Sequence, residues 1–272
     1  MKKPILLASS ALLLIALIGW TRVRPSNNRD WSIGQERLPH ARFHGDSVTI
    51  GSFRNFDYDS TGNPTATTYE TRSYDLNQLQ TVWFVLAPFE PENRGPAHSF
   101  LTFGFADSQY IAVSVEARKE RNESYSILKG ILKRYEIMYV VGDERDLIRL
   151  RVARGDDVYL YPIRTTPAKA RALFVQMMER ANALATHPEF YNTLTNNCTT
   201  NILAHANSVA TKKIPYGREV LLPGYADELA RELGLIATDL PIEQARRRFR
   251  INERARAAFD DASFSTRIRL SE

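Results

Sequence analysis

The order of the apolar segments along the chain is the feature that most limits its fold. Short runs that alternate or stay continuously apolar fill the first half, and such runs predict β-strands. They lie at 47–53, 81–87, 98–105, 110–116, 137–141, 147–152 and 158–163. After Thr166 the apolar residues recur at helical spacing instead, as in Leu173, Phe174, Met177, Met178, Ala181 and Leu184. A block of strands followed by a block of helices predicts the α+β class.

Two local signals refine this outline. The runs 98–105 and 110–116 are separated only by the turn 106–109, which predicts a β-hairpin. Further along, Asn196 or Asn197 can cap a helix that carries Cys198. Other helices are expected from Pro167 onward, over 226–233 before Gly234, and in an Arg-rich segment over 241–259.

The composition excludes several classes of protein. The 272 residues are 43% hydrophobic and 25% charged, which supports a buried core and rules out disordered, collagen-like and multi-span membrane chains. The net charge of +5 is basic without being extreme. A single cysteine excludes an intramolecular disulfide and zinc sites built from several cysteines. No predicted helix carries a His-x-x-x-His pair, so no metal and no cofactor are expected.

The N-terminus predicts the compartment. Lys2 and Lys3 precede an apolar run from Ile5 to Trp20, which as a helix would span ~24 Å at ~1.5 Å per residue. The run is longer than a usual signal-peptide core, and no small-x-small cleavage site follows it. We therefore expect an uncleaved signal-anchor at 1–21, with the rest of the chain outside the cytoplasm and a polar linker at 22–39. A cleaved signal peptide is the alternative.

The only cysteine lies where a reactive thiol is expected. Polar residues precede Cys198 and a helical apolar pattern follows it, so it falls in the first turn of the predicted helix. The unpaired backbone N–H groups and the helix dipole favour a thiolate there, and the same N–H groups can hold an oxyanion. Cys198 is therefore the candidate nucleophile. The alternative is a buried structural cysteine, which is common in protein cores.

A thiolate enzyme also needs a base and a group that orients the base. Of the five histidines, at 40, 44, 98, 187 and 205, His98 is best placed, because it begins a strand after a Pro/Gly loop. Glu116 ends the next strand of the predicted hairpin, and paired strands lie ~4.8 Å apart, so Glu116 is the candidate orienting group. The alternatives are a histidine satisfied in a loop or core and a glutamate on a solvated charged edge. Further candidates for oxyanion or substrate contacts are Tyr191, Asn196, Asn197 and Arg118.

Four ordered motifs carry a family resemblance. The runs AHSFLTFGF, SVEARKE, RYEIMYVVGDERDLIRLR and FYNTLTNNCTTNI resemble a bacterial family named after the periplasmic N-terminal domain of Lnb, an enzyme that moves an acyl chain within lipoproteins. The resemblance covers about Trp31 to Asn207. It implies a permuted papain-like, NlpC-type domain with an antiparallel sheet, in which a strand His precedes a helix-borne Cys. His98 and Cys198 match that order, which supports Cys198 as nucleophile, His98 as base and, more weakly, Glu116 as orienting group.

The resemblance also implies a domain organisation and a location. We expect the Lnb-like domain over 40–215 and a helical, Arg-rich extension over 216–272. The chain is expected at the bacterial inner membrane, held by its N-terminal helix, with the main domain in the periplasm.

Two functions fit these expectations. The first is a membrane-anchored thiol enzyme of the cell envelope, either an acyltransferase or an amidase or other hydrolase. It acts on a lipoprotein, lipid or peptide acyl group by a Cys–His mechanism. The second is a non-catalytic module that binds lipid or peptide in a papain-like cleft. No nucleic acid is expected as a partner. The Arg-rich segment 246–256 contacts anionic headgroups or an acidic partner, or is a solvated helix packed on the domain.

Overall fold

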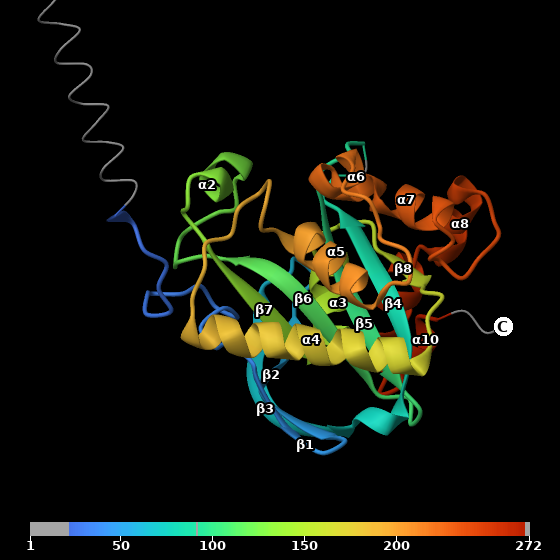
Figure 1. The fold of residues 1–272 in the computed structure, drawn as a ribbon, viewed down its shortest axis with the longest axis horizontal. Helices are drawn as coiled ribbons and strands as arrows, with labels where there is room; N and C mark the ends of the chain where they lie inside the picture. The colour runs from blue at the N-terminus through green and yellow to red at the C-terminus, as the bar shows by residue number, and fades with distance from the viewer. Residues whose placement is uncertain (1–21, 91, 270–272) are drawn as a thin grey trace, which may run out of the picture.

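A computed structural model describes residues 22–90 and 92–269, which form one sheet with helices on both faces (Figure 1). The predicted α+β class is confirmed, since the described residues form eight strands and nine α-helices. The strands are β1 (His40–His44), β2 (Ser47–Tyr58), β3 (Pro64–Asp75), β4 (Leu79–Pro88), β5 (Ala97–Phe105), β6 (Tyr110–Arg118), β7 (Glu136–Asp143) and β8 (Tyr159–Pro162). The helices are α2 (Ile127–Ile131), α3 (Glu144–Ala153), α4 (Pro167–Thr186), α5 (Cys198–Val209), α6 (Arg218–Leu221), α7 (Ala226–Glu232), α8 (Ile242–Phe249), α9 (Asn252–Ala258) and α10 (Phe264–Arg267).

The sheet is mixed, which corrects the expectation of an antiparallel one. Its strands follow the order β1-β2-β7-β6-β5-β4-β8, and β3 also pairs with β2. The pairs are antiparallel except for β2 with β7, which run parallel and meet at Arg54 and Gly142. Gly142 permits this approach, because a Cβ there would lie 2.5 Å from the carbonyl oxygen of Arg54. The parallel pair thus joins the curved ribbon of β1–β3 to the central strands (Figure 1).

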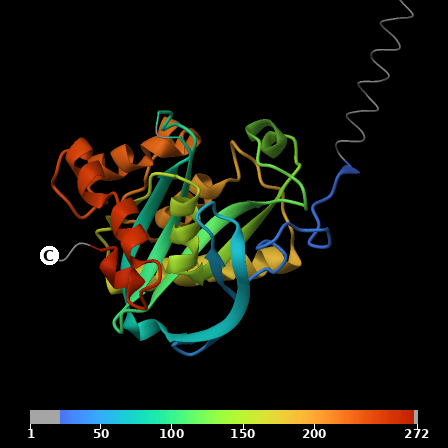
Figure 2. The same cartoon turned by 180° about the vertical axis from the view of Figure 1, so that it is seen from behind.

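Two helical layers cover the central strands. On one face lie α4 and α5, where the ring of Phe174 packs edge-on against that of Phe103 with centroids 5.1 Å apart. On the other face lie α3, α9 and α10, which bury Ile148, Ala255 and Phe264 (Figure 2). Because both faces of β4 to β7 are covered, these strands are buried over most of their length and rich in apolar residues.

The segment 147–152 is helical, which corrects the strand predicted there. It lies in α3, which begins after Asp143, whose carboxylate accepts a hydrogen bond from the N–H of Arg145. The alternation of apolar residues with arginine is typical of a strand with one solvated face. Here, however, Arg151 is buried and pairs with Glu116, and Arg149 pairs with Asp57. The alternate polar residues therefore do not mark a solvated strand face.

Two polar segments also differ from expectation. No strand is predicted for β3, because its residues are mostly exposed and polar and leave no apolar pattern. The single Arg-rich helix expected over 241–259 is two helices, α8 and α9. They are separated because Arg250 is extended and the N–H of Ile251 donates to the carbonyl of Val158. Arg246 is buried beside Asp227, so α8 packs on the domain.

The segment 22–39, expected as a linker, lies against the body of the molecule. Trp31 is buried, and the guanidinium of Arg118 lies 4.0 Å from its ring centroid. Asn27 donates to the carbonyls of Leu184 and Ala185 at the end of α4. Within residues 22–90 and 92–269, no helix has the length and apolar character needed to cross a bilayer. The predicted signal-anchor at 1–21 lies outside the described residues.

Candidate functional site

The β5–β6 hairpin brings His98 and Glu116 together. The predicted hairpin is confirmed, with Phe100 opposite Ser114. Continued outward by two residues, this register sets His98 opposite Glu116, on the same face of the sheet as Ser114. Nε2 of His98 lies 3.2 Å from Oε1 of Glu116. Both side chains belong to strands, so the backbone pairing of the sheet sets their separation.

Ser114 connects the two side chains. Its Oγ lies 2.7 Å from Nε2 of His98, and its hydroxyl donates to Oε1 of Glu116 at 2.8 Å. Since the hydroxyl hydrogen points to the carboxylate, the serine oxygen accepts a hydrogen bond from the Nε2–H group. Sequence reasoning missed Ser114. Its position two residues before Glu116 on the same predicted strand is the signal that identifies it.

The N-terminus of α5 holds the thiol. The side chain of Asn197 accepts a hydrogen bond from the N–H of Thr200, and the hydroxyl of Thr200 accepts one from the N–H of Asn197. This capping box confirms the predicted start of the helix and makes Cys198 its first residue. Cys198 is only 6% exposed, and its sulfur lies 3.7 Å from the hydroxyl of Thr199. The backbone N–H of Ser99 also hydrogen-bonds to the sulfur, so the thiol lies next to the first residues of β5.

The three side chains control one another's ionisation. Burial raises the pKa of the Cys198 thiol, but the hydrogen bond and positive charge of His98 outweigh burial and lower that pKa to about 7. Burial opposes protonation of His98, but the charge of Glu116 outweighs it and raises the imidazole pKa. Burial also disfavours the Glu116 carboxylate, but His98 and Arg151 hold its pKa well below its usual range. Near neutral pH the site therefore contains an ionised Glu116 and a thiolate–imidazolium pair.

The two ring nitrogens of His98 have different partners. Nε2 faces Ser114 and Glu116. Nδ1 is thus the ring nitrogen left to interact with Cys198, whose side chain contributes to the raised pKa of His98. One ring nitrogen is thus held by groups of the sheet, and the other is left for the thiol, an arrangement that could support general-base chemistry.

Arg151 completes the support of the carboxylate. Its Nη2 lies 2.9 Å from Oε1 of Glu116, and its side chain is only 9% exposed. The same oxygen therefore accepts a hydrogen bond from Ser114 and lies within ion-pair distance of both His98 and Arg151. Arg151 was not found from the sequence, because the segment that carries it was predicted as a strand rather than as α3.

Three of the other predicted residues lie in or beside the loop that precedes α5. Tyr191 is buried, and burial together with the charge of Cys198 raises its pKa, so it belongs to the surroundings of the thiol. The Asn196 amide donates to the carbonyl of Phe190 and so shapes the loop. Asn197 caps α5. The two asparagine side chains therefore position the thiol through the backbone.

The structure sets Arg118 and His205 apart from this cluster. The guanidinium of Arg118 donates to the carbonyls of Gln35 and Glu36, and this holds the segment before β1 against the sheet. His205 lies with its Nε2 2.7 Å from the hydroxyl of Tyr139. Burial, with the nearby charge of Arg180, lowers its pKa to about 4, so it is a neutral core histidine.

Backbone groups at the start of α5 can hold an oxyanion. The N–H groups of Cys198 and Thr199 occupy the first turn, where no intrahelical acceptor exists. Neither has an acceptor in the described part of the chain. Free N–H groups next to a nucleophile are the usual means of stabilising the tetrahedral intermediate of acyl transfer.

An apolar cavity of about 490 Å³ is lined in part by Thr199, the residue that follows Cys198 in sequence. Strands β4 and β5 and helices α4, α5 and α7 form its walls, with Val82, Phe84, Leu101, Leu173, Ile202 and Leu229 among the lining residues. Lys169, Lys212 and Lys213 also line it. Its size is in the range of ~300–1,000 Å³ typical of small-molecule sites.

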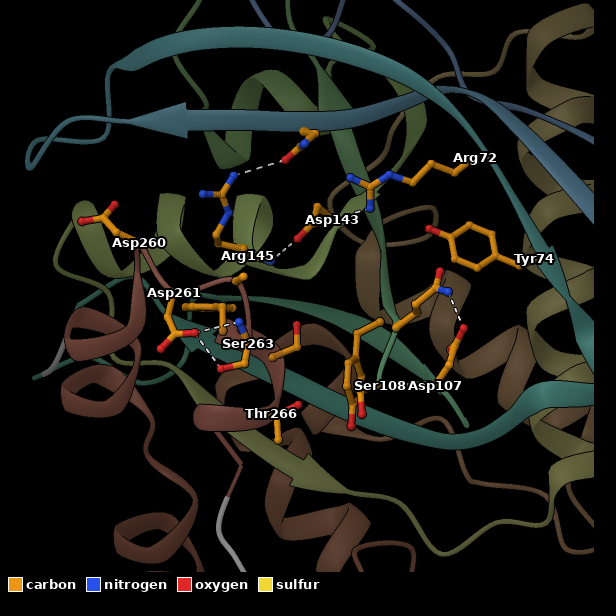
Figure 3. Close-up of a pocket in the computed structure, with 16 residues that line it drawn as sticks. Arg72, Tyr74, Asp107, Ser108, Asp143, Arg145, Asp260, Asp261, Ser263 and Thr266 are labelled. Carbon is orange, nitrogen blue, oxygen red and sulfur yellow. Dashed lines mark hydrogen bonds and ion pairs between the residues drawn. The ribbon is translucent and has the colours of Figure 1, made fainter.

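A second pocket, of about 690 Å³, is polar and separate from the thiol (Figure 3). Arg72 and Asp143 line it and form an ion pair at 2.9 Å, and Asp261 accepts hydrogen bonds from Ser263. Its polar groups thus largely satisfy one another.

Comparison with protein families finds one match. A family model described as the Lnb N-terminal periplasmic domain matches residues 66–224, which is more than half of the chain. The matched range contains His98, Ser114, Glu116, Arg151 and Cys198. Comparisons with curated proteins and with solved structures find no match.

Proposed function

The chain belongs to the Lnb N-terminal periplasmic domain family, and from this premise we propose that it is a thiol acyltransferase or hydrolase of the cell envelope. The observation that carries the proposal is the buried pair of Cys198 and His98, with the imidazole held by Glu116 and the thiol pKa lowered to about 7. A histidine on a strand that precedes a cysteine at a helix start also supports the permuted papain-like arrangement. The run at 5–20 supports attachment to the inner membrane.

The proposed reaction proceeds in two balanced steps. The Cys198 thiolate attacks the carbonyl carbon of an ester or amide, and the oxyanion is held by the N–H groups at the start of α5. The imidazolium of His98 gives its proton to the leaving alcohol or amine as the thioester forms. Water or an amine then attacks the thioester while His98 accepts its proton, and the thiolate is released. Glu116 stays ionised throughout and stabilises the imidazolium.

The apolar cavity favours an acyl chain as the substrate group. Thr199 lines the cavity and its hydroxyl lies 3.7 Å from the sulfur of Cys198, so an acyl chain in the cavity could present its carbonyl end to the thiol. Lysines at the cavity suit an anionic headgroup or a carboxylate.

Thiol alkylation tests the proposed nucleophile directly. We expect iodoacetamide to label Cys198 with a rate that rises through pH 7, as its lowered pKa requires. His98→Ala should slow labelling at neutral pH and move the rise toward the pKa of an ordinary thiol, near ~8.5. His187→Ala is the matched control, since His187 is exposed and pairs only with neighbouring Thr186. A labelling profile that does not change in His98→Ala would contradict the proposal.

A second experiment tests the chemistry. The full chain in vesicles is incubated with phosphatidylethanolamine that carries an alkyne-tagged acyl chain. We expect a hydroxylamine-sensitive tag on the peptide containing Cys198, and no tag in Cys198→Ser. A tag that persists in Cys198→Ser would exclude Cys198 as the acyl acceptor.

A further inference from the structure

Most of the exposed apolar side chains gather at one end of the molecule. Twelve large apolar side chains are exposed in the described part of the chain, and nine of them come from four short segments. The segments are 88–96 between β4 and β5, 125–132 around α2, 191–197 before α5, and 214–222 around α6. We call their exposed residues the rim surface, which is represented by Phe89, Tyr125, Leu128, Leu194, Tyr216 and Leu222.

Direct contacts link each of the four segments to another. The rings of Phe89 and Tyr125 lie 6.5 Å apart, which links the β4–β5 loop to the α2 region. The hydroxyl of Thr193 donates to a carbonyl at the start of α2. The hydroxyl of Tyr216 donates at 2.8 Å to the carbonyl of Leu194. The rim surface therefore runs from the β4–β5 loop across α2 to the α6 region.

A further contact closes this path. The N–H of Gly224 donates to the carbonyl of Gly95, and a side chain of Leu222 lies next to Gly95. The segment around α6 therefore also contacts the β4–β5 loop. In Figure 1 the two helices α2 and α6 lie at the same end of the sheet, opposite the curved ribbon of β1–β3. Contiguous apolar surface of this kind marks a docking site.

Two of the rim segments lead in sequence to the residues of the thiol site. The segment 88–96 leads into His98, and 191–197 leads into Cys198. Tyr125 also contacts Tyr191, whose pKa responds to the charge of Cys198. A surface that meets the rim would therefore deliver its molecules directly to the nucleophile.

Two observations indicate that the partner is a lipid bilayer. The first described segment, drawn in blue, lies on the α2 side of the molecule in both views, and the apolar run Ile5–Trp20 precedes it in sequence (Figures 1 and 2). The rim also combines aliphatic residues, tyrosines and lysines, with Leu128 62% and Tyr216 58% exposed. Lys129 lies within α2, and Lys212 and Lys213 precede Tyr216. This mixture is typical of surfaces that enter the headgroup region of a membrane.

We infer that the rim surface docks on a phospholipid bilayer, with its apolar side chains in the interfacial region and its lysines among anionic headgroups. The inference concerns binding and does not depend on the chemistry of Cys198. It is tested in the Cys198→Ser background, where labels can be placed at single new cysteines.

The experiment measures which residues enter the bilayer. Leu128→Cys, Leu222→Cys and Phe43→Cys are made separately in the full chain carrying Cys198→Ser. Each is labelled with an environment-sensitive NBD fluorophore and reconstituted in vesicles of phosphatidylethanolamine and phosphatidylglycerol. Phe43 is the matched control, because it is 37% exposed and lies in β1 at the opposite end of the molecule. All three positions are exposed, so the labels leave the core intact.

We expect blue-shifted emission from the labels at 128 and 222, and quenching of both by lipids brominated on their acyl chains. The label at 43 should keep its aqueous emission. Emission at 128 and 222 equal to that at 43 would overturn the inference. A blue shift without quenching by brominated lipid would also overturn it, since the rim surface would then be covered by protein. A tether at the N-terminus cannot mimic the expected result, because quenching requires contact with the acyl chains.

Discussion

Nε2 of His98 lies 3.2 Å from Oε1 of Glu116, and the pairing of β5 with β6 sets that distance. The same carboxylate oxygen accepts a hydrogen bond from Ser114 and pairs with Arg151, and these contacts help to keep the half-buried Glu116 ionised. A permanent negative charge beside the ring keeps His98 protonated when the thiolate forms. The relationship between these two residues therefore explains why the thiol pKa falls to about 7 rather than rising with burial.

Replacing the base should remove most of the activity. In His98→Ala the leaving group receives no proton and the thiolate loses its positive partner, so we expect kcat to fall by about 10²–10⁴-fold. Transfer from the alkyne-tagged phospholipid measures the loss. His205→Gln is a useful control because His205 is a core histidine paired with Tyr139. Equal losses in both variants would show a general effect on folding rather than a role for His98.

Glu116→Gln should change how stability depends on pH. Glu116 has a lowered pKa, so its charge stabilises the fold above its ordinary pKa of 4.5, and this contribution is lost as the pH falls through the lowered value. His98 has a raised pKa, so its contribution is complete below 6.5 and is lost as the pH rises through the raised value. The difference in unfolding free energy between the wild-type protein and the variant should therefore be largest between pH 4.5 and 6.5.

Urea unfolding of both proteins over a pH series measures this difference. Glu179→Gln, at a position on α4 outside the site, provides the baseline for losing one carboxylate. A difference that stays constant from acid to alkaline pH would show that His98 and Glu116 do not share a charge interaction in solution.

Arg151→Met should act on the site through Glu116. Removing one partner of a fully buried ion pair costs about 3–5 kcal/mol, so a loss toward the lower end is expected here because Glu116 is partly exposed. The exposed pair of Arg171 with Asp46 should contribute far less. Chemical denaturation of Arg151→Met and Arg171→Met compares the two. In Arg151→Met the acid limb of the alkylation profile should also shift, because Arg151 lowers the pKa of both Glu116 and His98. If Arg151→Lys returns the acid limb part of the way to its wild-type pH, the charge of Arg151 is the cause. If the limb does not change in Arg151→Met, Arg151 contributes only to the stability of the fold.

Asp146 provides a stability prediction away from the thiol. Its carboxylate accepts hydrogen bonds from two guanidinium nitrogens of Arg54, the N–H of Phe56 and the hydroxyl of Tyr58, and it joins α3 to β2. Asp146→Ala leaves a buried guanidinium without its charge partner, so we expect a loss of about 3–5 kcal/mol. Asp239→Ala, whose carboxylate is 96% exposed, should cost under about 1 kcal/mol. Similar midpoints of urea unfolding for the two variants would contradict this account.

Asn197→Ala tests how the helix cap holds the nucleophile. Loss of the cap costs about 0.5–2 kcal/mol. It also frees the first turn of α5, so we expect slower alkylation of Cys198 at neutral pH. Asn197→Asp keeps the cap acceptor and should restore the stability. Thermal unfolding and alkylation rates, measured on the same samples, separate the effect on stability from the effect on the thiol. If Asn197→Ala loses stability but is alkylated at the wild-type rate, the cap does not position the thiol.

Local patterns in the sequence were sufficient for several elements. The hairpin of β5 and β6 follows from two apolar runs and a short turn, and the start of α5 follows from the capping asparagine before Cys198. Both depend on interactions within a few residues, which is why they are readable without tertiary contacts. The same reading fails for 147–152, because an arginine that pairs across the fold is indistinguishable in sequence from one that faces water.

The amino-acid sequence by itself determined the α+β class, the hairpin that carries His98 and Glu116, and the helix start that carries Cys198. Only the tertiary structure decided that the sheet is mixed, that Ser114 and Arg151 hold Glu116, and that Arg118 supports the segment before β1 instead of the site. It also showed an apolar cavity whose lining includes Thr199, next to Cys198 in sequence. The reason is physical: local elements depend on neighbours in the chain, whereas ionisation and cavities depend on charges and walls contributed by distant segments.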